Sequence, residues 1–169
     1  GQTREDGKTP YMTHPIAVAE SIAKILMAPL PPGVPDPWTP ITKDHIVTAA
    51  LLHDVVEDTD VTLAQVTTEF PSEVAEMVRL LTREQGTSYY EYLAKVSQDP
   101  KAVLIKIEDI RHNYKDMPNN KSSKGRKEKY LLALALLGDD PLDLIHGPPE
   151  SPKRFAYLPG GAPKPVVSD

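Results

Sequence analysis

The sequence contains no cysteine and no long apolar run. Without cysteine the chain cannot form a disulfide framework, a thiolate zinc site or a cysteine nucleophile. Its longest apolar run, from Tyr130 to Leu137, has eight residues, whereas a membrane-spanning helix needs about 20. We therefore expect no membrane association. The polar first ten residues also lack a signal peptide, so the expected location is the cytoplasm.

The chain also lacks an excess of positive charge, because its formal net charge is −5. Binding to nucleic acid irrespective of sequence needs a basic footprint, so a stable nucleic-acid partner is not expected. The segment from Arg111 to Lys129 is the exception, with seven basic and two acidic residues. A local basic patch can attract a small anion. The alternative is that these charges only solvate a loop and the start of a helix.

The length of 169 residues is that of one domain, with or without a tail. Residues 147–169 are rich in proline and glycine, which disfavours a packed helix. We therefore predict a domain over residues 1–146, followed by an extended or disordered tail over 147–169.

Proline and helix-capping residues divide the domain into segments with helical spacing of apolar residues, and no segment alternates with period two. The predicted class is therefore all-α, with about seven helices. Six prolines between residues 29 and 40 predict a rigid extended loop after the first helix. The predicted helices begin near Pro15, Thr42, Thr62, Pro71, Ser88, Asp99 and Ser122 or Ser123, and the second one runs to about Glu57.

Polar residues interrupt the apolar pattern at the end of that second helix. His53 and Glu57 are four residues apart, as are Asp54 and Asp58, a spacing that places each pair on one helical face. An imidazole beside three carboxylates is costly to bury without a cation, and this donor set suits Mn, Fe or Zn. The alternative is an exposed acidic helix end with one incidental histidine, although carboxylates there oppose the helix dipole.

Further ligands for a cation must come from other segments. His14 stands at the start of the first helix, and Asp109 lies late in an apolar helix with Asn113 one turn further on. Each has an ordinary alternative, as a capping or packed histidine and as a solvent-facing aspartate. His112 is either a further ligand or a core residue bonded to backbone, and the second is favoured. His45 and His146, without carboxylate companions that the sequence can place, are predicted to be structural.

Three segments together resemble a known family. Thr13-His14-Pro15, then His53-Asp54-Val55-Val56-Glu57-Asp58-Thr59, then Asp109 followed by His112-Asn113 are similar to the motifs of the HD superfamily of metal-dependent phosphohydrolases. The narrower resemblance is to the hydrolase domain of the RelA/SpoT guanosine tetraphosphate enzymes and their small stand-alone relatives. Gly1-Gln2-Thr3-Arg4, Gly7 and Pro10-Tyr11 add to it. The resemblance covers residues 1 to about 137 and implies an HD-domain helical bundle.

The resemblance also implies roles for individual residues. One divalent ion, usually manganese, would bind His14, His53, Asp54 and Asp109. Glu57 and Asp58 would orient or deprotonate the attacking water, Arg4 would pack on the guanine base, and Asn113 would contact the sugar region. The implied reaction, part of the stringent response, is hydrolysis of the 3′-pyrophosphate of guanosine tetra- or pentaphosphate. Its products are pyrophosphate and GDP or GTP.

Charged residues near these motifs also bear on the substrate. Lys115 and its basic neighbours follow the Asp109 helix, where they are expected to neutralise phosphate charge. Glu5, Ile110, Asp116 and the proline-rich loop depart from the pattern of alarmone hydrolases. These departures leave an alternative open, an HD phosphohydrolase acting on another nucleotide or on NADPH. A non-catalytic nucleotide- or protein-binding module is a third interpretation, and the presence of Glu57 and Asp58 disfavours it.

Overall fold

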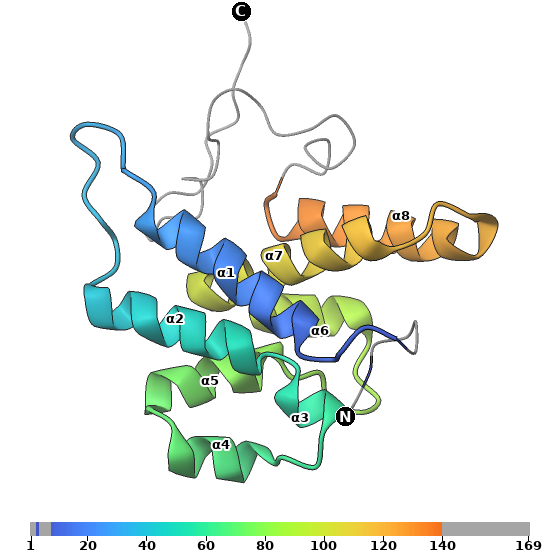
Figure 1. Cartoon of the computed structure of the whole chain (residues 1–169), viewed down its shortest axis with the longest axis horizontal. Coiled ribbons are helices and arrows are strands. Elements are labelled where there is room, and N and C mark those ends of the chain that lie inside the picture. The colour runs from blue at the N-terminus through green and yellow to red at the C-terminus, as the bar shows by residue number, and fades with distance from the viewer. Residues whose placement is uncertain (1–2, 4–7, 140–169) are drawn as a thin grey trace, which may run out of the picture.

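The computed structural model describes residue 3 and residues 8–139, which form an all-α bundle (Figure 1). The only β-type pairing in these residues is an isolated bridge between Thr3 and Pro10. The helices are α1 (Thr13–Met27), α2 (Pro40–Leu52), α3 (Val55–Asp58), α4 (Leu63–Glu69), α5 (Ser72–Leu81), α6 (Tyr89–Val96), α7 (Pro100–Asp116) and α8 (Lys121–Leu136). The all-α prediction is confirmed. Arg4, His146 and the predicted tail over 147–169 lie outside the described residues.

Two predicted capping boxes start α4 and α6. Thr62 Oγ1 accepts the backbone N–H of Gln65, and the Gln65 side chain accepts the N–H of Thr62 in return. Ser88 and Glu91 repeat this exchange at α6. Each box satisfies two backbone donors that the first helical turn leaves without partners. These two helix starts are therefore confirmed as predicted.

Besides small shifts in α2, which begins at Pro40, and in α5, which begins at Ser72 after Pro71, two other helix starts differ from the prediction. α1 begins at Thr13, so Pro15 is its third residue and not its first. α8 begins at Lys121, because the side chain of Asn120 accepts the N–H of Ser123 and caps the helix before either predicted serine. Both differences lie within the few residues by which local signals define a helix end.

The predicted helix from Thr42 to Glu57 is interrupted at His53 and Asp54. Helix α2 ends at Leu52, and His53 Nδ1 donates to the carbonyl of Ala50 over 2.8 Å. The carbonyl of Asp54 then accepts the backbone N–H groups of Glu57 and Asp58, which starts the short helix α3. The prediction that His53 and Glu57 share one helical face is therefore wrong, and this break adds an eighth helix to the described chain.

Helix α7 is the central element of the bundle. It packs against α1, α2, α5, α6 and α8, which surround it in Figure 1. Ile105, Ile107 and Ile110 are almost fully buried, and burying such a side chain stabilises a fold by about 1.5–3 kcal/mol. This apolar packing carries charged residues of α7 into the interior, among them Asp109, of which 3% is exposed.

The proline-rich connection between α1 and α2 projects at one end of the bundle (Figure 1). Lys43 ties the end of α1 to this connection, since its Nζ donates to the carbonyl of Leu26 over 2.9 Å and pairs with Asp36. The 15 residues of α1 span about 22 Å at 1.5 Å per residue. The connection therefore lies one helix length from His14. None of the described helices combines the length and the apolar character that crossing a bilayer requires.

Candidate metal centre

Four side chains from three separate segments converge in the interior. His14 comes from the first turn of α1, His53 and Asp54 from the break after α2, and Asp109 from α7. One ligand atom from each residue lies within 4.8 Å of all the others. Nitrogen and oxygen ligands bind zinc at about 2.0–2.2 Å, so ligands of one ion lie within about 4.4 Å of each other. Small side-chain adjustments would therefore let all four bind one ion.

The four ligand atoms are in close mutual contact. Asp109 Oδ1 lies 3.0 Å from His14 Nε2 and 3.6 Å from His53 Nε2. Asp54 Oδ2 lies 3.0 Å from His53 Nε2 and 3.8 Å from His14 Nε2. Two imidazole nitrogens and two carboxylate oxygens form a donor set that suits a divalent transition metal such as manganese, iron or zinc.

His53 supplies the observation that tests whether a cation fits. Its Nδ1 donates to Ala50, so in the neutral ring Nε2 carries the lone pair. Nε2 is buried and lies 3.0 Å from Asp54 Oδ2, but it makes no hydrogen bond with that oxygen or with any other group in the described part of the chain. A buried polar atom without a partner is uncommon in folded proteins, and a histidine held through its other nitrogen is the usual arrangement of a metal ligand. The residues therefore fit a bound cation.

The two carboxylates also favour a positive charge in this centre. Burial lowers the pKa of His53, but Asp109 and Asp54 outweigh burial and raise this pKa to about 10. Without a cation, His53 is therefore protonated at neutral pH. A metal ligand must be a neutral imidazole, so cation binding displaces the proton.

This competition predicts proton release on cation binding. At pH 7.5 we expect titration with manganese to release about one proton per ion, and the affinity to weaken about tenfold for each pH unit below 10. Calorimetry in two buffers that differ in ionisation enthalpy measures the number released. Equal heats in both buffers would show that no proton leaves and that the pKa of His53 is not raised.

Lys106 lies one turn before Asp109 and was missed in the sequence analysis. Its Nζ contacts Asp109 Oδ2 over 2.7 Å, while Asn113 Nδ2 donates to Oδ1 over 2.6 Å. Burial opposes ionisation of Asp109, but Lys106 and His14 together hold its pKa well below the usual range. A lysine within the apolar run from Val103 to Ile110 is the sequence signal that could have identified it.

Removing this lysine is expected to destabilise the cation-free fold. Lys106→Met removes the closest charged partner of the buried Asp109 carboxylate and leaves the protonated His53 ring, 3.6 Å away, beside it. Breaking a buried ion pair costs about 3 kcal/mol. Urea unfolding with a chelator measures the loss of unfolding free energy, and added manganese is expected to restore part of it. Lys124→Met, which removes an exposed ion pair with Glu128, is the control. Equal stability of both variants would contradict a buried ion pair.

His112 differs from its prediction as a core residue bonded to backbone. Its Nδ1 shares a 2.9 Å hydrogen bond with His14 Nδ1, and the two ring centroids are 4.8 Å apart. His112 therefore holds the nitrogen of His14 that faces away from the centre. The prediction that His45 lacks a carboxylate companion is wrong, because Glu73 Oε2 lies 2.8 Å from its Nδ1.

Glu57 and Asp58 lie in α3 at the exposed edge of the centre. Glu57 Oε1 accepts the backbone N–H of Arg83 over 2.7 Å. Burial raises the pKa of Glu57, and the charges of Asp54 and Asp58 add to this, against the N–H of Arg83 and the charge of Lys106. Burial and Asp54 likewise raise the pKa of Asp58. A raised pKa suits a carboxylate that accepts a proton near neutral pH.

A cavity of about 870 Å³ lies beside the centre, within the size range of small-molecule sites. His112 and Asn113 line it, which connects it to His14 and Asp109. Arg126 and Tyr130 of α8 also contribute to the lining, but Lys115 does not. The other lining residues are Thr9, Thr13, Asp116, Met117, Pro118, Ser122 and Ser123.

The basic segment is only partly available to this cavity. Arg111 forms two hydrogen bonds with the carboxylate of Asp139, so it is occupied by a structural pair. Lys115 is exposed on α7. The expectation that Arg111 and Lys115 neutralise phosphate charge stays a prediction, and Arg126 is the residue of the basic segment that lines the cavity.

Comparisons with known proteins agree with this architecture. A family model described as HD domain matches residues 1–132. The chain is 34% identical over 139 residues to a guanosine-3′,5′-bis(diphosphate) 3′-pyrophosphohydrolase of Haemophilus influenzae, covering 75% of this chain and 18% of that protein. It is 30% identical over 135 residues to the Aquifex aeolicus protein of the same name, covering 75% and 17%. The chain thus spans less than a fifth of these relatives.

A solved structure also has a similar fold. It is described as a metazoan ortholog of SpoT that hydrolyzes ppGpp, and it superposes with a TM-score of 0.58 at 23% identity. The match covers 88% of this chain and 78% of the other. At this level of identity the likeness concerns the fold alone.

Proposed function

Because this chain belongs to the HD-domain family, we propose that it is a metal-dependent hydrolase that removes the 3′-pyrophosphate of guanosine tetra- or pentaphosphate. The observation that carries the proposal is the convergence of His14, His53, Asp54 and Asp109 within 4.8 Å, beside two carboxylates and a cavity. The relatives named as 3′-pyrophosphohydrolases support the choice of substrate. Manganese is the proposed ion.

In the proposed chemistry, the cation and the side chains of the protein have separate roles. When bound, a divalent cation lowers the pKa of water and polarises a phosphoryl oxygen. Asp109 would bind it through Oδ1, since Lys106 holds Oδ2. Glu57, held by the N–H of Arg83, would orient the attacking water and take its proton, with Asp58 beside it.

The cavity would receive the nucleotide. Asn113 both bonds Asp109 and lines the cavity, so it is positioned to connect the sugar region to the centre. Arg126 would supply positive charge to a phosphate group. Arg4 and Lys115 stay predictions as base- and phosphate-binding residues.

Incubation of manganese-loaded protein with guanosine tetraphosphate tests the proposal. We expect pyrophosphate and GDP as products, at a rate well above that of chelator-treated protein. Nucleoside mono-, di- and triphosphates and NADPH, assayed in parallel, test the alternative substrates. Release of phosphate from one of these, with none from guanosine tetraphosphate, would reassign the substrate and leave the hydrolase class intact.

A further inference from the structure

Positive charge gathers on one side of the centre, around Tyr89 at the start of α6. Arg83 lies in the connection before α6, Lys106 in α7 and Lys129 in α8. Lys129 Nζ stands 4.0 Å from the centroid of the Tyr89 ring, and Lys106 Nζ stands 5.3 Å from that of Tyr92. The Tyr89 and Tyr92 rings are themselves 6.1 Å apart. These contacts join α8 to the edge of the metal centre.

Lys129 faces other cations and no carboxylate. Among the described residues, no acidic group lies within ion-pair distance of its Nζ. Burial lowers the pKa of Lys129, and the positive charges of Arg83, Lys106 and Arg126 lower it further. Cations that repel one another in this way are stabilised by an anion between them.

The hydroxyl of Tyr89 is a second polar group whose partner is missing among the described residues. Its Oη is buried and makes no hydrogen bond within the described part of the chain. The hydroxyl lies close enough to Lys106, Tyr130 and Asp109 for their charges to act on it, although burial is the main cause that raises its pKa to about 12. Tyr89 therefore keeps its proton at neutral pH and offers a hydrogen-bond donor next to Lys129.

Arg83 links Lys129 and Tyr89 to Glu57, which lies at the exposed edge of the metal centre. Its backbone N–H donates to Glu57 Oε1, and its side-chain Nε and Nη2 both donate to the carbonyl of Thr87, over 2.9 and 2.6 Å. These bonds hold the guanidinium in the turn before α6. A guanidinium has five N–H donors, so further donors remain for an anion.

We propose that Arg83, Tyr89 and Lys129 form a phosphate-binding site beside the metal centre, which takes the terminal phosphate of a pyrophosphoryl group. The inference rests on the proposed function, because the inner phosphate of the same group would lie at the cation. One hydroxyl donor, the bonded guanidinium of Arg83 and the ammonium of Lys129 suit a terminal phosphate, which carries more charge than a carboxylate or a bridging phosphate. The site would thus favour substrates that carry a pyrophosphate over those with a single phosphate.

Calorimetric titration of manganese-loaded protein with inorganic pyrophosphate tests the site without turnover. Lys129→Met keeps an unbranched side chain of similar length and removes the charge, and Tyr89→Phe removes only the hydroxyl. We expect the dissociation constant for pyrophosphate to rise about tenfold in each variant, the loss typical of one charge-assisted hydrogen bond. Lys129→Arg is expected to bind within about threefold of the native protein, because it keeps the charge.

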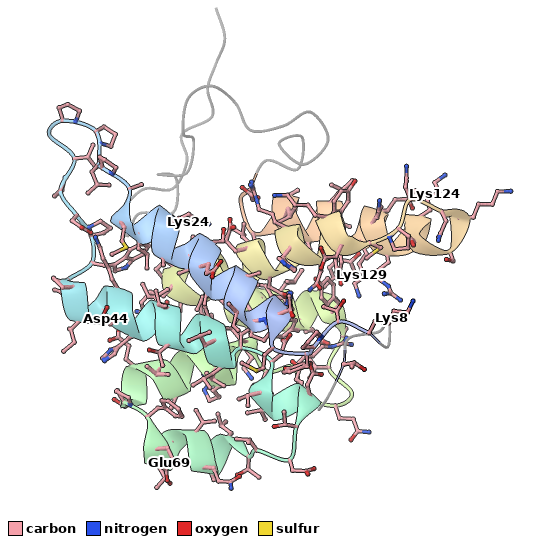
Figure 2. All side chains as sticks on the ribbon, viewed as in Figure 1. Lys8, Lys24, Asp44, Glu69, Lys124 and Lys129 are labelled. Carbon is pink, nitrogen blue, oxygen red and sulfur yellow. The ribbon has the colours of Figure 1, made fainter. Side chains whose placement is uncertain are left out.

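Lys124→Met is the matched control. Lys124 is on the same helix but pairs with Glu128, and Figure 2 shows it at the outer end of α8, away from Lys129. Thermal unfolding of all variants excludes a general loss of structure. If Lys129→Met and Tyr89→Phe bind pyrophosphate as the control does, the phosphate site is wrong. If they bind it weakly but the native protein does not hydrolyse guanosine tetraphosphate, the site stands and the proposed substrate fails.

Discussion

Replacement of Asp54 by alanine is expected to abolish both cation binding and hydrolysis. Asp54 supplies one of four ligand atoms, and its Oδ2 lies 3.0 Å from His53 Nε2. Loss of even an outer-shell partner costs about 10–100-fold in metal affinity, so we expect loss of a direct carboxylate ligand to exceed about 100-fold. Metal analysis after dialysis and pyrophosphate release at a fixed manganese concentration measure the two effects.

A matched substitution separates the loss of a ligand from the loss of an acidic charge. Asp44 is exposed on α2 and lies on the opposite side of the bundle from Lys129 in Figure 2. Asp44→Ala should retain full cation content and native turnover. A variant Asp54→Ala that keeps the cation after dialysis would remove Asp54 from the ligand set, whatever its activity.

The variant Glu57→Gln should keep the cation and lose turnover. Glutamine preserves the shape and the oxygen that accepts the N–H of Arg83, but it cannot take a proton from water. General base catalysis contributes about 10²–10⁴-fold, so we expect kcat to fall within that range with cation content unchanged. Single-turnover assays over a pH series measure the fall in the rate of hydrolysis.

The pH profile gives a separate test of Glu57. Because burial raises its pKa, the native rate should fall as the pH drops through a value above that of an ordinary glutamate, about 4.3. This limb should disappear in Glu57→Gln. Glu69→Gln, which alters an exposed residue at the end of α4, is the control. Native turnover in Glu57→Gln would assign proton transfer to another group, with Asp58 the nearest candidate.

Local signals in the sequence predicted most helices correctly. Thr62 with Gln65 and Ser88 with Glu91 each satisfy backbone groups within four residues, so neighbouring side chains alone determine those starts. The break at His53 is different. Helical spacing continues through it, and the buried bond from His53 to Ala50 replaces continuation of the helix only once the ring is packed inside the domain.

The partners of the site residues depended on tertiary contacts. His14 and Asp109 are 95 residues apart, and His14 and His112 are 98 apart, so spacing within one segment cannot indicate these bonds. The resemblance to a family identified the four converging residues in advance. It contained nothing on Lys106 or Tyr89, whose roles follow from burial and from the groups that surround them in the fold.

The projecting connection between α1 and α2 provides an attachment point for a probe. Pro32 is exposed there, and α1 separates it from His14 by about 22 Å at 1.5 Å per residue. As the native chain contains no cysteine, Pro32→Cys would introduce a unique thiol. A fluorophore coupled to that thiol would report the position of the protein while leaving the cavity and the four converging side chains untouched.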